Sequence, residues 1–153
     1  MIALLAIGLV AMTACLGLQA YAAMVAARYF TRIANHPLRP RPRRLLFRQF
    51  ATLMLVLMLG NIVQVLLWAL LYRQLDAFAD LETAIYFSGV TFSSLGYGDV
   101  VLPRELRLLG PLQAANGLMM FGITTALFFA AIQAAIRKGM KPAADRESPD
   151  TQA

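Results

Sequence analysis

The sequence predicts an all-α membrane protein with three membrane-spanning helices and one shorter segment that enters and leaves the bilayer on the same side. Two observations lead to this fold class. Of the 153 residues, 59% are hydrophobic and only 14% are charged, a composition too apolar for an ordinary soluble domain. Three uncharged runs, residues 1–27, 49–72 and 108–136, are each long enough to cross a hydrocarbon core of about 30 Å as a helix.

The first run, residues 1–27, is interpreted as a retained transmembrane helix. A secretory signal is the alternative, because Ala20-Tyr21-Ala22 resembles a small-residue cleavage site. The run lacks a basic segment at its start, is longer than the apolar part of most signals and is followed by arginines, which favours retention. Small residues four apart, such as Ala22 and Ala26, would let another helix approach closely, although alanine is common in membrane helices in any case.

Residues 28–48 are expected to form a basic cytoplasmic loop, because they contain seven arginines and no acidic residue. The amino terminus would then lie outside, and the basic residues after the third run would again be cytoplasmic. Three prolines between residues 37 and 42 rule out a regular helix there, whereas residues 43–50 could form a short amphipathic helix on the membrane surface. Since the arginines lie beside apolar spans, anionic lipid headgroups are the expected partner, and nucleic acid is not.

The second span, residues 49–72, carries two polar groups and two aromatic residues that need a place in the bilayer. Asn61 and Gln64 lie within the span, where interhelical hydrogen bonds are the simplest role for them. Trp68 and Tyr72 lie near its outer end, a pattern typical of an interfacial aromatic belt.

The uncharged run from Thr83 to Gly98 is too short to span the membrane. Asp80 can cap a helix over residues 82–93, whose part from Thr83 to Ser93 would descend about 16 Å, roughly half the hydrocarbon core. Residues 94–98 in extended form would climb back a similar distance. Backbone polar groups at that depth cannot face lipid, so we expect this re-entrant turn to line a passage filled with water or ions.

The turn itself reads Ser-Leu-Gly-Tyr-Gly-Asp over residues 94–99. Gly96 and Gly98 can adopt backbone conformations that are closed to other L-residues, so successive carbonyl oxygens can point the same way and replace the water shell of a cation. This motif resembles the selectivity filter of the potassium channel superfamily, whose pattern is TVGYGD. The resemblance covers residues 49–137 as a two-transmembrane pore module, with the first helix as an additional element.

The resemblance implies a homotetramer that passes potassium ions, because one chain supplies one filter strand. Residues 94–98 would form the filter, and Asp99 would form an acidic ring at the outer mouth that concentrates cations. Tyr97 would point away from the axis and brace the filter against the short helix. The ion-coordinating carbonyls implied by the resemblance are those of Ser94, Leu95, Gly96 and Tyr97, within a filter that Gly98 completes.

The filter departs from the family pattern at two positions. Ser94 replaces threonine and keeps the hydroxyl, and Leu95 replaces valine with a larger side chain. Nearby, Tyr86 and Phe87 occupy the places where many relatives carry tryptophans, and Val90 stands where some carry a glutamate that partners the filter aspartate. These departures leave a weakly selective cation channel as an alternative.

The third span, residues 108–136, would be the inner helix that lines the cavity. Gly117 and Gly122 could provide a bend for gating, and close helix packing is the alternative role for both. Gln113 and Asn116 are further candidates for interhelical hydrogen bonds. The candidates for the cavity wall are Thr124, Thr125 and Phe128.

Catalysis is not expected, because the one histidine lies in the basic loop and the chain contains no Ser/His/Asp set and no nucleotide fingerprint. No cofactor is expected apart from the transported potassium ion. Residues 138–153 form a polar tail with the composition of a disordered segment. The sequence therefore predicts a passive, multi-pass potassium channel of the cell membrane, with a non-conducting subunit or a part of an active uptake system as the alternatives from other classes.

Overall fold

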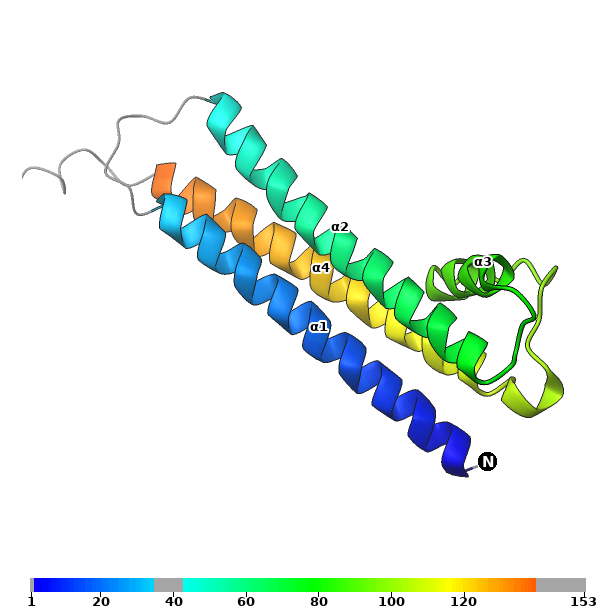
Figure 1. The fold of residues 1–153 in the computed structure, drawn as a ribbon. Helices are drawn as coiled ribbons and strands as arrows, with labels where there is room; N and C mark the ends of the chain where they lie inside the picture. Colours follow the sequence, from blue (N-terminus) through cyan, green and yellow to red (C-terminus); the bar gives the residue numbers. More distant parts are fainter. Residues whose placement is uncertain (1, 35–42, 140–153) are drawn as a thin grey trace, which may run out of the picture.

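The computed structural model describes residues 2–34 and 43–139. Helix α1 spans Ile2–Ala34, α2 spans Arg43–Gln74, α3 spans Leu81–Phe92 and α4 spans Leu109–Gly139, with a short 3-10 helix, η1, at Arg104–Leu106. The described residues form no strand. Helices α1, α2 and α4 lie side by side, with α2 running opposite to the other two, and α3 lies beside the end of the bundle at which α1 begins (Figure 1).

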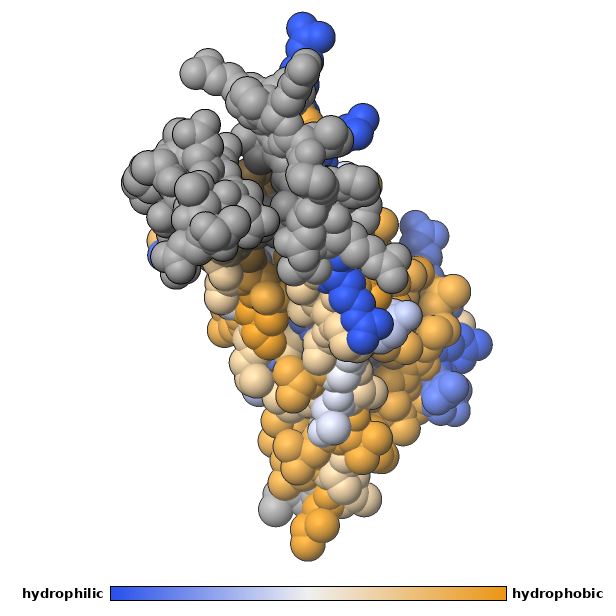
Figure 2. Space-filling model, turned by 90° about the vertical axis from the view of Figure 1, so that its left-hand side faces the viewer, coloured by the Kyte–Doolittle hydropathy of each residue, from blue (hydrophilic) through white to orange (hydrophobic). Residues whose placement is uncertain are grey.

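Three of these helices are long and apolar enough to cross a membrane, over Ile2–Arg28, Phe47–Gln74 and Leu109–Ile136. Helix α3 has 12 residues and would reach only about 18 Å, which is too short for a span. Hydrophobic side chains cover most of the described surface in the view of Figure 2, which fits a lipid surrounding. The predicted all-helical membrane fold with three spans is confirmed.

The helices extend further into the basic segment 28–48 than the sequence suggested. Helix α1 continues to Ala34, and α2 begins at Arg43, so residues 43–50 are helical but continuous with α2. Arginine is a good helix former, and a helix satisfies its own backbone in lipid or in water, so the end of the apolar run need not end the helix. The predictions for His36, the prolines and the tail beyond Gly139 lie outside the described residues.

Helix α1 packs on α2 and α4 through a narrow stripe of residues. A Cβ atom at Gly8 would lie 2.5 Å from Leu112 Cδ1, so α1 and α4 come very close at this level. On the α2 side, a Cβ atom at Gly60 would lie 3.7 Å from Ala22 Cβ. The stripe consists of Gly8, Met12, Cys15, Gln19, Ala22 and Ala26. Successive residues of the stripe are alternately four and three positions apart, as in coiled coils.

A polar cluster, which we call the Thr124 cluster, joins the three long helices inside the bundle. Gln64 Nε2 donates to Gln19 Oε1 at 2.8 Å, and Gln19 Nε2 donates to Thr124 Oγ1 at 3.0 Å. Asn61 Nδ2 donates to the same hydroxyl at 3.4 Å. The predicted interhelical hydrogen bonds of Asn61 and Gln64 are thereby confirmed. Gln64 bonds to α1 and Asn61 bonds to α4, and Gln19 of α1 bonds to α4.

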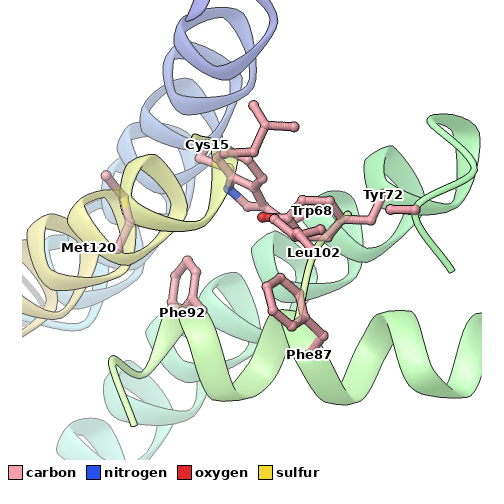
Figure 3. Packing of buried hydrophobic residues seen from close by; sticks show 9 residues of the cluster. Cys15, Trp68, Tyr72, Phe87, Phe92, Leu102 and Met120 are labelled. Carbon is pink, nitrogen blue, oxygen red and sulfur yellow. The ribbon is translucent and has the colours of Figure 1, made fainter. Parts of the chain in front are cut away.

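Trp68 and Tyr72 do not form an interfacial belt, and that prediction was wrong. Their side chains are 1% and 0% exposed. Helix α3 folds back over this end of α2, and the ring centroid of Phe87 lies 5.3 Å from that of Tyr72 in an edge-to-face arrangement. Figure 3 shows Phe87 facing Trp68 and Tyr72, with Phe92 next to Met120 of α4. The aromatic residues therefore form the core that holds α3.

Replacing Thr124 with valine should weaken the attachment of α4 to both α1 and α2. We expect Thr124→Val to lower the free energy of unfolding by about 1 kcal/mol, because two interhelical hydrogen bonds of average membrane strength are lost. Thr125→Val is the matched control, since the Thr125 hydroxyl donates only to Phe121 O of its own helix. Unfolding of both variants in detergent micelles would measure the difference, and equal losses would contradict the role of the Thr124 cluster.

Candidate functional site

The short helix α3 begins at a side-chain cap. Asp80 has extended backbone angles, and its Oδ1 accepts a hydrogen bond from Thr83 N–H at 2.7 Å. This hydrogen bond lowers the pKa of Asp80 below its ordinary value, because it stabilises the charged carboxylate. Glu82 lies in the first turn, where it complements the helix dipole. The cap predicted from the sequence is confirmed.

The loop that follows α3 is hydrogen-bonded to the carboxyl end of this helix. Ser94 N–H donates to Thr91 O at 2.9 Å, and Leu95 N–H and Gly96 N–H both donate to Val90 O, at 3.0 and 3.4 Å. The last carbonyls of a helix have no hydrogen-bond partner within the helix, so the loop amides donate to carbonyls that would otherwise be unpaired. As a result, the first part of the loop is anchored on the carboxyl end of α3.

These bonds determine where the loop carbonyls point. The described chain contains no cis peptide bond, and in a planar trans peptide the C=O of one residue points opposite to the N–H of the next. Because the amides of Leu95 and Gly96 point toward α3, the carbonyls of Ser94 and Leu95 point away from it. Within the described residues, no hydrogen bond is accepted by the carbonyl oxygens of residues 94–97.

The backbone of this loop alternates in handedness. Ser94, Gly96 and Gly98 have φ angles of 60°, 57° and 79°, whereas Leu95 and Tyr97 between them do not have positive φ. Alternation of this kind places successive N–H groups on one side of the chain and leaves the carbonyls for the other side. Glycine adopts these angles without steric cost, while Ser94 pays about 1–2 kcal/mol for the left-handed conformation.

The side chains of the loop are open in a single chain. Leu95 is 58% exposed and Tyr97 is 66% exposed, so its own chain leaves most of each side chain uncovered. A Cβ atom added to Gly96 or Gly98 would meet nothing within 4 Å. Backbone angle, not space, is therefore what requires glycine at these two positions within one chain.

Asp99 ties the end of the loop back to α3. Tyr86 O–H donates to Asp99 Oδ2 at 2.5 Å, and Val100 N–H donates to Asp99 Oδ1 at 2.9 Å. The Tyr86 hydrogen bond lowers the pKa of Asp99 and raises the pKa of Tyr86, because it favours the charged carboxylate and the neutral phenol. The sequence marked Tyr86 only as a departure from a family pattern, and this contact was not predicted.

The two glycines proposed as hinges have different surroundings. A Cβ atom at Gly117 would lie 1.9 Å from Phe92 O and 2.8 Å from Phe92 C, so the last residue of α3 contacts the α4 backbone directly. At Gly122 an added Cβ would meet nothing within 4 Å. Of the two roles considered for Gly117, close packing is the one that these contacts support.

Of the three candidates for a cavity wall, two are engaged inside the chain. The Thr124 hydroxyl accepts hydrogen bonds from Gln19 and Asn61, and the Phe128 ring lies 6.0 Å from that of Phe50 in an edge-to-face contact. Thr125 is exposed on α4. Thr125 is therefore the candidate with a side chain on the open face of this helix.

A model of the ion channel family matches residues 50–134, which is more than half of the chain. The chain belongs to the ion channel family. The match begins in α2, includes α3 and the loop after it, and ends in α4, so α1 is an additional apolar helix of this ion channel. The comparison with curated proteins gave no match, and neither did the comparison with solved structures.

Membership in this family confirms the resemblance to a two-transmembrane ion channel module with an additional first helix. With three apolar helices of spanning length, this ion channel is a multi-pass membrane protein. The ion channel family is not an enzyme family. The anchored loop between α3 and η1 lies inside the matched segment, which makes its backbone the candidate functional site of the channel.

Alanine at Gly117 should disturb α3, whereas alanine at Gly122 should not. We expect Gly117→Ala to destabilise the protein by more than 1 kcal/mol, since α4 and the backbone of Phe92 must move apart; overpacking typically costs about 1–3 kcal/mol. Gly122→Ala should instead add about 0.8 kcal/mol through helix propensity. Unfolding in detergent micelles measures both, and a stabilising Gly117→Ala would disprove the close contact.

Removing the Tyr86 hydroxyl should raise the pKa of Asp99. In the wild type the bonded carboxylate is charged at neutral pH, and the attachment is lost only as the pH falls through the lowered pKa of Asp99. In Tyr86→Phe we expect Asp99 to titrate at a higher pH than in the wild type, because the largest cause of its lowered pKa is removed while the Val100 hydrogen bond remains. Carbon NMR of labelled Asp99 measures the titration, with Tyr21→Phe as a control on α1. An unchanged Asp99 titration in Tyr86→Phe would contradict the hydrogen bond.

Proposed function

We propose that the chain forms a homotetrameric, potassium-selective channel in which four copies of residues 94–99 surround one axis. The observation that carries this proposal is the direction of the loop backbone. The amides of Ser94, Leu95 and Gly96 bind the end of α3, and the carbonyls of Ser94 and Leu95 point away from it. The alternation of φ angles continues through Gly98, and it would direct the carbonyl oxygens of Gly96 and Tyr97 to the same side as those of Ser94 and Leu95.

A row of free carbonyl oxygens suits a dehydrated cation. Carbonyl oxygens can replace the hydration shell of K⁺, and the carboxyl end of α3 adds the negative end of a helix dipole beside the loop. Residues 93–99 contain no basic side chain, and Asp99 contributes a negative charge at the far end. Together, these groups favour cations over anions and would concentrate them at the mouth of the pore.

A single chain cannot complete this site. It supplies one row of carbonyl oxygens and leaves the side chains of Leu95 and Tyr97 exposed. Backbone groups without partners cost several kcal/mol each in hydrocarbon, so the loop cannot face lipid. In a fourfold assembly, neighbouring copies would cover Leu95 and Tyr97, and the carbonyls would face the shared axis.

The orientation follows from charge. We propose that the amino terminus and the loop lie outside the cell membrane and that the carboxyl end of α4 is cytoplasmic. Arg44 and Arg48 are exposed near the start of α2, where they would meet the anionic headgroups of the inner leaflet. Potassium would then enter or leave through the mouth that carries Asp99, down its gradient and without a cofactor.

A weakly selective cation channel is the second candidate. Ser94 adopts a left-handed conformation that costs energy, and Leu95 is larger than the valine of the family pattern. A filter whose backbone is strained at its inner end would discriminate less sharply between cations of different size. This candidate keeps the same fold, assembly and ion path and differs only in how well sodium is rejected.

Flux through liposomes decides among these functions. Purified protein is reconstituted with either a potassium or a sodium gradient, and its mass in detergent is measured by light scattering. Potassium flux without sodium flux, from a particle of four chains, would support the proposal. Equal flux of both ions would favour the second candidate, while a monomer or an absence of flux would overturn the channel function proposed for this chain alone.

Gly96→Ala should abolish potassium flux but leave membrane insertion intact. Alanine at a φ of 57° costs about 1–2 kcal/mol in each of four copies, and relief of that strain would turn the carbonyls of the loop. Gly17→Ala is the control, because an added Cβ at Gly17 also meets nothing within 4 Å and lies on α1. If Gly96→Ala conducts as the wild type does, residues 94–97 are not the ion path.

A further inference from the structure

A second polar cluster, the Gln113 clamp, joins α2, α3 and α4 near the loop. Tyr72 O–H donates to Gln113 Oε1 at 2.8 Å. Gln113 Nε2 donates to Ser88 Oγ at 2.6 Å and to Ser88 O at 3.2 Å, and Ser88 Oγ donates to Val65 O at 2.7 Å. The side chains of Tyr72, Ser88 and Gln113 are all 0% exposed.

The hydrogen bonding of this clamp is complete. The amide of Gln113 uses its oxygen once and its nitrogen twice, and the Ser88 hydroxyl both donates and accepts. The Thr124 cluster differs, because Gln64 Oε1 and Asn61 Oδ1 are buried there without a partner in the described structure. A complete buried network has one geometry of low energy, since any sliding of a helix leaves a buried polar group unpaired.

The clamp acts at the end of α3 that carries the loop. Ser88 lies two residues before Val90, whose carbonyl binds the amides of Leu95 and Gly96. Gln113 lies four residues, about one turn, before Gly117, where α4 contacts Phe92 O. Helix α4 therefore touches the carboxyl half of α3 at two successive turns, once through a hydrogen-bonded amide and once through backbone packing.

We propose that Gln113 is a positioning residue that determines ion selectivity. Its amide fixes the separation and rotation of α3 relative to α4, and α3 in turn fixes the carbonyls of residues 94–97. An apolar side chain of similar size would fill the same space but would let α3 slide, so the carbonyl ring would lose its fixed width. This inference rests on the proposed channel function, and Gln113 itself touches no ion.

Amide exchange tests the positioning role without any conduction. In Gln113→Leu we expect the amides of residues 93–98 to exchange at least about threefold faster, the factor that corresponds to one lost membrane hydrogen bond of about 0.6 kcal/mol. Gln64→Leu is the matched control, because Gln64 is equally buried but belongs to the Thr124 cluster, and its side chain donates to Gln19 of α1 and not to α3. Mass spectrometry of the wild type and both variants in lipid nanodiscs gives the comparison.

Ion flux tests the consequence for selectivity. The ratio of potassium to sodium flux should fall at least about threefold in Gln113→Leu for the same loss of hydrogen bonding, and it should stay at the wild-type value in Gln64→Leu. Tyr72→Phe removes one bond of the clamp and keeps the Gln113 side chain, so it should shift the ratio in the same direction by a smaller factor. If Gln113→Leu does not fold, the flux ratio of Tyr72→Phe tests the proposal in its place.

The two proposals fail in different ways. If the wild type conducts no ions, the channel function fails, whereas the exchange comparison still shows whether Gln113 positions the loop. If Gln113→Leu lowers only the unfolding temperature and leaves loop exchange and the flux ratio as in the wild type, Gln113 is a stability residue and the inference is overturned. The inference is also overturned if Gln64→Leu changes the amide exchange of the loop and the flux ratio as much as Gln113→Leu does.

Discussion

The rest of the site depends on the hydrogen bonds between the last carbonyls of α3 and the amides of the loop. Helix ends leave carbonyls unpaired, and in a membrane neither those carbonyls nor the amides of an irregular loop can be left to lipid. The pairing of Val90 O with Leu95 and Gly96 satisfies both needs. Because trans peptides are rigid, it also turns the opposite edge of the backbone, with its free oxygens, away from the protein.

The position of α3 therefore matters more than any single side chain of the loop, and the bundle fixes that position by several means. The aromatic core around Trp68, Tyr72 and Phe87 holds one side of α3 by apolar contact, which is strong but not directional. The amide of Gln113 and the absent side chain of Gly117 add direction and distance. Helix α1 reaches this core through Cys15, and its polar attachment, through Gln19, acts on Gln64 of α2 and Thr124 of α4 further along the bundle.

Sequence reasoning succeeded where the cause is local or follows from the solvent. The three spans followed from the cost of placing charges in hydrocarbon, which depends only on which residues are adjacent in the chain. The Asp80 cap followed from a contact that spans three residues. The glycine pattern of the loop predicted the positive φ angles of Gly96 and Gly98, because few other residues adopt such angles at low cost.

Tertiary structure decided the contacts between residues far apart in the chain. The partners Tyr86 and Asp99 are 13 residues apart and Ser88 and Gln113 are 25 apart, and no local pattern says which polar groups will meet. The burial of Trp68 was decided in the same way, by α3 folding back over α2. Thus hydropathy and backbone stereochemistry determined the spans and the special loop, while only packing, which depends on how helices meet in space, decided what holds that loop in place.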